Sequence, residues 1–316
     1  MLRTLDLERE RKFWTSEDVF PDPDFPLHVL FADPQPPLPL HAHVDFMELT
    51  FVYRGKAVHR VEEETYLIRA GDVFVIRGAR RHGFEEIQDL YLVNVVFDER
   101  RFLKPFHELR QLPHFHVLFH LEPQFRQRHR FESRLVLDPR ELAYAMSIVE
   151  TIHKELIQRS LGFSAIVTGL FLQLVGFCCR CYRKEQHPLT QSLIDMGTVL
   201  YHIDKHYDEQ IEINQLVALS RMPYRTFMRS FKEITGFSPT QYIIRLRLEK
   251  ACHLLSTTTL PVTEIAFHVG FDDSNYFARQ FHNVIGLSPS HYRNTHKHPP
   301  ELLLRPQNQL PEKDDA

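Results

Sequence analysis

The chain has few cysteines, little net charge and one long apolar run. Its four cysteines, at positions 178, 179, 181 and 252, do not have the spacing of an ordinary disulfide framework, so we expect a reduced, intracellular compartment. The formal net charge of −3 excludes a polycation that coats nucleic acid through charge alone. Residues 1–14, MLRTLDLERERKFW, lack the apolar stretch of a secretory signal, and we expect none.

The apolar run, LGFSAIVTGLFLQLVGFCC at 161–179, has no charged residue. Its length is close to that of a membrane span. Ser164, Thr168 and Gln173 interrupt it, however, and no aromatic belt flanks both ends. A helix that is apolar on nearly all sides can instead be buried between domains or subunits. We favour burial and keep a membrane-tethered receptor as the alternative.

A length of 316 residues suggests two or three domains. Residues 1–39 form an N-terminal arm that is rich in proline after position 20, which favours an extended or sheet-edge segment over a helix. At the other end, the polar residues 297–316 are expected to be disordered.

Short runs of β-type residues fill the segment from 40 to 97. They read ELTFVY, AVHRV, TYLIR, DVFVIR and LYLVNVVF, and the first two are separated by a turn signal at Arg54-Gly55-Lys56. Short strands at this spacing indicate a sandwich or barrel. We therefore expect a β-domain at 40–138, with irregular structure from 98 onward.

A helical segment is expected at 139–186. Asp138 and Pro139 suit the N-cap and first position of a helix, and an apolar stripe follows. Its members are Leu142, Ala145, Val149, Ile152 and Leu156. Together with the apolar run this predicts an antiparallel helix pair that joins two subunits. Packing of the pair onto the β-domain is the alternative.

Residues 191–296 contain the same short sequence twice. FKEITGFSPTQY at 231–242 and FHNVIGLSPSHY at 281–292 match at an offset of 50. Each copy follows a short apolar helix and a turn, and Gly and Ser-Pro signals end one helix and begin the next. A short helix, a tight turn and a second helix with an exposed polar face form a helix-turn-helix unit, whose second helix can enter a DNA major groove.

The helix expected between the two copies, at 238–255, would span roughly 27 Å. This is close to the repeat of the major groove, so two recognition helices can reach adjacent groove segments. Residues 190–297 carry 11 Lys and Arg against 10 Asp and Glu. Specific binding must therefore depend on individual contacts more than on net charge. The histidines from 202 to 298 are assigned to the surface, without a metal-ligand set.

The segment RLRLEKACHLL…VTEIAFHVGFDDSNYFARQFHNVIGLSPSHYR resembles the signature of AraC/XylS-type transcription regulators. The resemblance covers 191–296 and implies a seven-helix DNA-binding domain with two helix-turn-helix units. Arg and Asn can bind guanine and adenine through paired hydrogen bonds. Phosphate contacts or salt bridges within the domain are the alternative for the arginines. The implied base-reading positions are Arg225, Thr226, Arg229, Ser274, Asn275 and Arg279.

Two earlier segments, at 37–55 and 71–84, resemble the cupin motifs. The Pro-x-Gly of the second motif is absent. AraC-type regulators often carry such a domain to bind an effector, frequently a sugar. Alternation along a strand would put His41 and His43 on one face. The motif positions that the resemblance implies are His41, His43, Glu48 and Gly55 in the first motif, and Gly71 and His82 in the second.

Three interpretations of His41, His43, Glu48 and His82 stay open. The group can bind a divalent transition metal, contact a small-molecule effector, or form a structural hydrogen-bonded cluster. Asn94, a polar residue in an apolar run, is a further effector contact if it faces inward. Cys178, Cys179 and Cys181 are interpreted as buried apolar side chains, with a redox or metal sensor as the alternative.

The sequence thus predicts an α+β multidomain chain. It has an N-terminal cupin-like β-barrel, a helical dimerisation segment, and a C-terminal all-α domain with two helix-turn-helix units. The predicted function is a cytoplasmic, homodimeric transcription regulator, not an enzyme, that binds double-stranded DNA and responds to a small molecule, which the resemblance implies is a sugar. RNA polymerase is a further expected partner, and no cofactor is certain. The alternative is a metal-dependent cupin enzyme or a metal sensor fused to a DNA-binding domain. The operator, the effector and the direction of regulation stay open.

Overall fold

The computed structural model describes residues 13–32, 35, 40–77, 81–103, 106–110, 112–121, 135–182 and 188–295. Two compact units meet in sequence between Ile194 and Asp195. The first unit combines a sheet with helices and the second is helical, so the α+β multidomain prediction is confirmed. The predicted tail at 297–316 and part of the proline-rich arm lie outside the described residues.

The first unit is built on an antiparallel sheet in which β7 (His82–Phe97) pairs along most of β4 (Met47–Val61). The strand order is β2-β7-β4-β6-β8, and β5 pairs with β4. The remaining strands of this sheet are β2 (Leu27–Ala32), β5 (Glu64–Arg69), β6 (Asp72–Arg77) and β8 (Leu135–Val136). A separate parallel pair joins β1 (Phe13–Trp14) to β3 (Ala42–His43). Strands β1 and β2 thus bring the segment expected to be an arm into the β-structure.

The turn predicted at Arg54-Gly55-Lys56 is wrong, because β4 continues through it with shifts in register. Gly55 has a φ of +77°, and a Cβ atom there would lie 2.0 Å from the carbonyl oxygen of Asp89. Glycine is needed at this close approach of two strands. The irregularity also changes which residues share one face of β4, because even-numbered Val52 before it and odd-numbered Ala57 and Val61 after it join the same hydrophobic cluster.

The segment after residue 98 is more ordered than predicted. Four short helices occupy its described part, and the expectation of irregular structure is therefore wrong. Arg77, at the end of β6, holds them to the sheet: its Nη2 atom lies 3.3 Å from Glu99 Oε2, and Nη1 also contacts His120. No sequence motif encodes such long-range pairs. The helices are α2 (Glu99–Phe102), α3 (His107–Arg110), α4 (Pro113–His116) and the π-helix η1 (Val117–Leu121).

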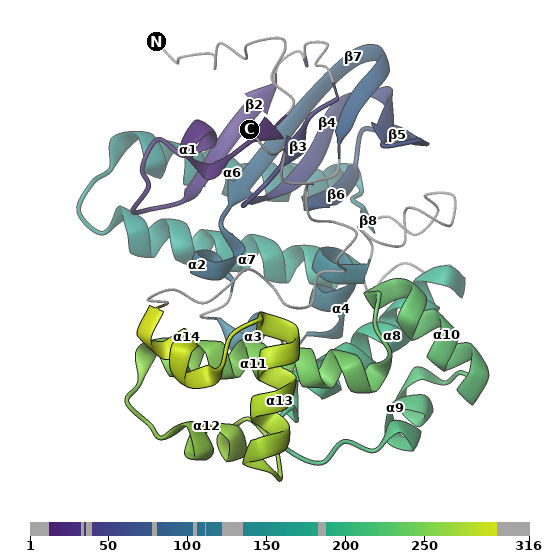
Figure 1. Cartoon of the computed structure of the whole chain (residues 1–316). Coiled ribbons are helices and arrows are strands. Elements are labelled where there is room, and N and C mark those ends of the chain that lie inside the picture. Colours follow the sequence, from purple (N-terminus) through teal and green to yellow (C-terminus); the bar gives the residue numbers. More distant parts are fainter. Residues whose placement is uncertain are drawn as a thin grey trace. The chain divides into compact units, whose positions relative to one another are not determined.

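Two long helices, α6 (Pro139–Gln158) and α7 (Phe163–Tyr182), run side by side and pack against the sheet (Figure 1). Asp138 caps α6 as predicted, by accepting hydrogen bonds from the backbone N–H groups of Arg140 and Glu141. The predicted stripe is buried except for Leu156, which is half-buried. Phe171 of α7 meets Phe97 of β7 with ring centroids 4.8 Å apart.

By length and composition α7 could cross a membrane, but this is weak evidence, because core helices of other proteins pass the same test. In its most apolar window 33% of the residues are buried. Its three cysteines are buried, and burial raises the pKa of Cys179 to about 12 and that of Cys178 well above its ordinary value. Thiols in this state are poor nucleophiles and poor redox sensors.

The second unit contains two similar helix pairs. The first pair is α9 (Ile213–Ser220) and α10 (Tyr224–Thr235), and the second is α12 (Val262–His268) and α13 (Ser274–Ile285). Gly236 and Gly286 end α10 and α13 in the left-handed conformation, as predicted. The flanking helices are α8 (Pro188–Lys205), which crosses the boundary between the units, α11 (Pro239–Thr257) and α14 (Pro289–Thr295).

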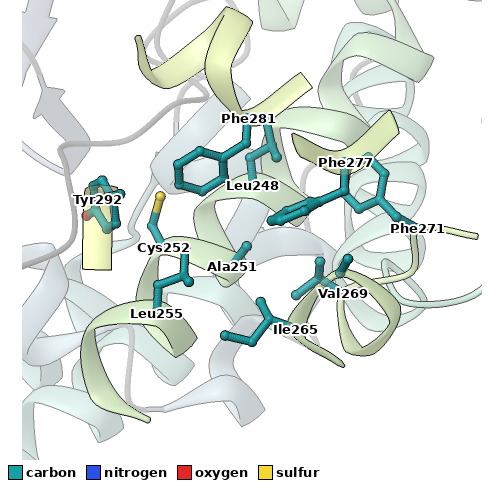
Figure 2. Close-up of a cluster of buried hydrophobic side chains, with 11 residues drawn as sticks. Leu248, Ala251, Cys252, Leu255, Ile265, Val269, Phe271, Phe277, Phe281 and Tyr292 are labelled. Atoms are coloured by element: carbon teal, nitrogen blue, oxygen red, sulfur yellow. The ribbon is translucent and has the colours of Figure 1, made fainter. Parts of the chain in front are cut away.

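Helix α11 is the common support of this unit, because it contacts α10, α12, α13 and α14. Ser238 caps it and Pro239 is its first residue, as predicted. Figure 2 shows Phe277 and Phe281 of α13 turned toward Leu248 and Ala251 of α11. This apolar contact leaves the opposite face of α13 available to solvent.

Candidate DNA-binding and effector sites

Helices α10 and α13 have the geometry of paired recognition helices. Both are 12 residues long and begin 50 residues apart. Each buries two phenylalanines: Phe227 and Phe231 in α10, and Phe277 and Phe281 in α13. The 19 residues of α11 between the two helix pairs span about 28 Å.

The predicted base-reading residues lie away from these buried faces. Arg225, Arg229, Asn275 and Arg279 are exposed, whereas Thr226 and Ser274 are half-buried. The Arg279 guanidinium carbon lies 6.0 Å from the centroid of the Tyr276 ring, which is itself exposed. The arginines are thus accessible to a nucleic acid instead of being packed in the interior.

In the β-domain the chain brings three predicted histidines together. His41 and His82 exchange both backbone hydrogen bonds as an isolated bridge, with N···O distances of 3.0 and 2.7 Å. His43 Nε2 lies 3.3 Å from His82 Nε2. One potential ligand nitrogen from each of the three rings falls within 4.8 Å of the others, and all three side chains are buried.

Glu48 joins this cluster from β4. Its Oε2 atom lies 3.3 Å from His43 Nε2, and its Oε1 accepts a hydrogen bond from Thr50. Thr50 and Asn94 are direct partners across β4 and β7, so their side chains share one face of the sheet. Asn94 therefore lies on the face that carries Glu48, and its Oδ1 atom is buried without a hydrogen-bond partner.

Burial controls the protonation of this cluster. It raises the pKa of Glu48 to about 8, against a smaller lowering by the Thr50 hydrogen bond. Burial, with a smaller contribution from His41, lowers the pKa of His43 well below its ordinary value. Proximity alone would suggest a Glu48–His43 ion pair, but both shifts favour the uncharged forms. At neutral pH we therefore assign a protonated Glu48 beside a neutral His43.

His59 belongs to the same cluster, although it occupies no motif position in the sequence. Its Nε2 atom lies 3.4 Å from His82 Nδ1, and its ring stacks on both Phe74 and Phe84. Counting alternate residues from Glu48 puts position 59 on the wrong face, because the β4 irregularity lies between them. Only the pairing register of β4 with β7 shows that His59 lies on the same face as Glu48.

Aromatic side chains from the N-terminal segment border the cluster. The Phe46 ring stacks on His43 with centroids 4.6 Å apart, and the Phe20 ring meets the edge of Phe46. Trp14, on β1, lies edge-on to His41. The cluster is thus a set of uncharged polar groups among apolar ring faces.

Arginines near His82 do not extend this site. Arg77 is engaged by Glu99, and Arg81 lies 3.0 Å from Glu62 in an exposed ion pair. Arg80 lies outside the described residues. The cluster therefore lacks a permanent positive charge from Arg77 or Arg81.

Comparison with known proteins gives matches across both units. Residues 31–175 match the AraC-like ligand binding domain, and residues 216–295 match a helix-turn-helix domain. The transcriptional activators RhaS of Shigella boydii serotype 18 and of Escherichia coli O157:H7 are each 30% identical, over 88% of this chain and 95% of theirs. The DNA-binding domain of AdpA, solved with a target DNA, is 33% identical over 32% of this chain and 90% of that one, with a TM-score of 0.31. A ligand-binding β-domain, two helix-turn-helix units and a relative matched along nearly its whole length place this chain in the AraC/XylS family of DNA-binding transcription regulators.

Proposed function

We propose that this regulator activates transcription in response to a carbohydrate bound by its β-domain, and that it is not an enzyme. The buried polar cluster carries the proposal. His43 Nδ1 and Asn94 Oδ1 are buried without hydrogen-bond partners, which is costly unless a bound ligand satisfies them. The proposed effector contacts are His41, His43, Glu48, His82 and Asn94, and we add Thr50 and His59, which lie beside them.

The protonation state favours an uncharged ligand. A neutral His43 and a protonated Glu48 offer donors and acceptors without net charge. The rings of Phe46 and Trp14 supply apolar faces near the same groups. A polyol has hydroxyl groups that can bond to the polar groups of the cluster, and C–H faces that can pack against the aromatic rings. An anion would be poorly stabilised in these uncharged surroundings. This chemistry, together with the similarity to RhaS, supports a sugar.

The proposed DNA contacts are the six positions on α10 and α13. Exposed Arg225, Arg229 and Arg279 are suited to guanine, and Asn275 to adenine. Thr226 and Ser274 are half-buried near the first residues of their helices. Their hydroxyl groups are suited to contacts with the DNA phosphates. Because a transcription regulator must reach the chromosome, we assign this protein to the cytoplasm. As an activator it would have RNA polymerase as a further partner.

We propose that the outer face of α6 and α7 joins two subunits. Tyr144 and Phe177 pack there with ring centroids 4.8 Å apart, and Gln173 donates a hydrogen bond to the Tyr144 hydroxyl. Ile166 is 46% exposed on α7, and Cβ atoms added at Gly169 or Gly176 would meet only open space. A smooth apolar face of this kind favours close helix packing between copies.

A divalent metal ion is the second candidate ligand of the β-domain. The three histidine nitrogens and the Glu48 carboxyl fit the donor types that zinc and related ions prefer. Ligands of one such ion lie closer together than 4.8 Å, so the rings would need to shift by less than about 1 Å. A bound ion would supply a positive charge and a Lewis acid at His41, His43, His82 and Glu48. Its binding would also require Glu48 to lose its proton.

One set of measurements separates these ligands. Thermal stability of the β-domain should rise with one sugar from a panel, and Asn94→Leu should abolish the rise without unfolding the protein. Metal analysis of purified protein tests the second candidate, and turnover of a bound compound would overturn the assignment as a regulator without enzymatic activity. Genome-wide mapping of bound DNA would identify operators, and the neighbouring genes would narrow the choice of effector.

A further inference from the structure

Two histidines mark the end of α8. His202 lies within the helix, and His206 follows it by one turn, with its backbone N–H still donating to the His202 carbonyl oxygen. The two ring centroids are 4.5 Å apart, with 32° between the ring planes. Two imidazoles spaced by four residues on one helical face can chelate a single divalent transition metal ion. This pair lies in the second unit and is distinct from the buried histidines of the β-domain.

Each imidazole also has a partner that can orient it. His206 Nδ1 lies 3.1 Å from Glu209 Oε2, and His202 forms a hydrogen bond with the side chain of Gln215 on α9. Metal-binding histidines usually donate their second ring N–H to a carboxylate, carbonyl or water, which fixes the tautomer and the ring orientation. Glu209 and Gln215 are placed to perform this role.

Charges of both signs act near this position, Lys205 and Glu209 among them. A neutral imidazole is the form that binds a metal ion, and burial and the neighbouring His206 lower the pKa of His202. Lys205, the positive group nearest in sequence, lies over the Tyr201 ring with Nζ 5.7 Å from the centroid. The Glu209 carboxylate meanwhile contributes negative charge beside His206.

The loop that follows α8 contacts the second helix-turn-helix unit. Arg247 of α11 donates hydrogen bonds to the carbonyl oxygens of Tyr207 and Glu209, at 2.6 and 2.7 Å. Gly270, in the α12–α13 turn, approaches the Asp208 backbone so closely that a Cβ atom would lie 2.8 Å from it. An ion held by His202 and His206 would thus stiffen a junction shared by α8, α9, α11 and this turn.

We propose that His202 and His206 bind one divalent transition metal ion, with Glu209 and Gln215 as orienting partners, and that the bound ion tightens DNA binding. The ion stabilises the ordered form of the α8–α9 connection, on which the first helix-turn-helix unit depends. The inference does not rest on the effector or metal assigned to the β-domain.

The test uses the full chain with His82→Gln in place, so that the β-domain cluster is weakened as a competing site. Titration with Co²⁺, followed by its visible absorption, and with Zn²⁺, followed by calorimetry, should give one ion per chain. Adding His202→Gln and His206→Gln should abolish this binding. Adding His253→Gln and His268→Gln, at two exposed histidines on other helices, should preserve it. Glu209→Gln should weaken binding severalfold, and circular dichroism confirms that each variant folds.

In the same parent, Zn²⁺ should tighten binding to an operator by about fivefold or more, and this effect should vanish with the His202/His206 pair. Unchanged metal binding in that double variant would overturn the site. Metal binding that leaves DNA affinity unchanged would overturn the proposed coupling.

Discussion

Arg159 donates a hydrogen bond from Nη2 to Asp22 Oδ2 at 2.8 Å, across 137 positions of sequence. Arg159 is the left-handed residue that ends α6, and Asp22 lies in the N-terminal segment just before β2. Phe25 strengthens the same connection, since its ring packs edge-on against Phe163 of α7. The segment that borders the effector cluster is therefore fastened to the turn between the two long helices.

Replacing Arg159 with alanine should loosen that segment. The amide of Asp24, which donates to Asp22 Oδ1, should exchange its hydrogen faster, and so should neighbouring amides. Exposed ion pairs contribute little free energy, so the melting temperature should change little. Hydrogen exchange followed by mass spectrometry measures this. Equal exchange in both proteins would show that Phe25 alone fastens the segment.

Glu48 should make a contribution to β-domain stability that is lost as the pH rises from about 4.5 to 8, whereas the lowered pKa values of His28 and His43 act in the opposite direction below about pH 6.5. Its pKa is raised by burial from 4.5 to about 8, so in this window the native state holds a proton that the unfolded chain has released. The Glu48 contribution to the free energy of unfolding then decreases by up to about 1.4 kcal/mol per pH unit. Glu48→Gln should remove this contribution, so the stability of the variant relative to the parent should rise with pH in this window. Urea unfolding followed by the fluorescence of Trp14, the one tryptophan, tests it. Parallel profiles for both proteins would contradict the neutral assignment of Glu48.

Gly270→Ala should destabilise the DNA-binding unit by about 1–3 kcal/mol. The residue has a φ of +88°, and the new methyl group would meet the Asp208 backbone. Gly286→Ala is the matched control, because its φ is +82° but a Cβ atom there meets nothing within 4 Å. The free energy of unfolding of the control variant should therefore fall only because alanine disfavours the left-handed backbone conformation. Thermal unfolding of the two variants should differ, and equal losses would exclude the steric contribution.

Removing Glu99 should also be destabilising. The Arg77–Glu99 pair is nearly buried, with side-chain exposures of 13% and 11%. Glu99→Ala leaves Arg77 with its His120 and Phe119 contacts but without its carboxylate partner, and we expect a loss of roughly 3 kcal/mol. Exposed Glu85, which pairs with Arg60, provides the control, since Glu85→Ala should cost less than about 1 kcal/mol. Similar losses would mean that the Arg77 pair behaves as a surface contact.

Arg229→Ala and Arg279→Ala should each weaken binding to a cognate operator by roughly 1–3 kcal/mol and relax one base preference. His282→Ala, at an exposed position in the last turn of α13, is a control that should leave the preference intact. Binding to a library of operator variants gives both quantities. Uniform loss across all sequences would reassign the two arginines to phosphate contacts.

The DNA-binding unit was readily predicted because its determinants are local in sequence. The cap at Ser238, the terminating Gly236 and Gly286, and the phenylalanine stripes each act within a few residues. Pro223 is the N-cap of α10, one residue before the first helical position that proline usually takes. Shifts of this size are usual at helix ends.

The β-domain was predicted less completely because its order depends on distant partners. The helices after residue 98 rely on Arg77, and β2 relies on pairing with β7. His59 escaped notice because a change of register within β4 changes which residues share one face. The motif histidines were found, since their spacing is local, but their convergence depends on the His41–His82 bridge.

Because both helix-turn-helix units pack on α11, their unfolding should be linked. Helices from both helix-turn-helix units rest on that one helix. If either helix-turn-helix unit unfolded, part of α11 would become exposed to water. The other helix-turn-helix unit would then lose part of the helix against which it packs. The two helix-turn-helix units should therefore unfold in one cooperative transition. A destabilising substitution in one unit should also lower the stability of the other.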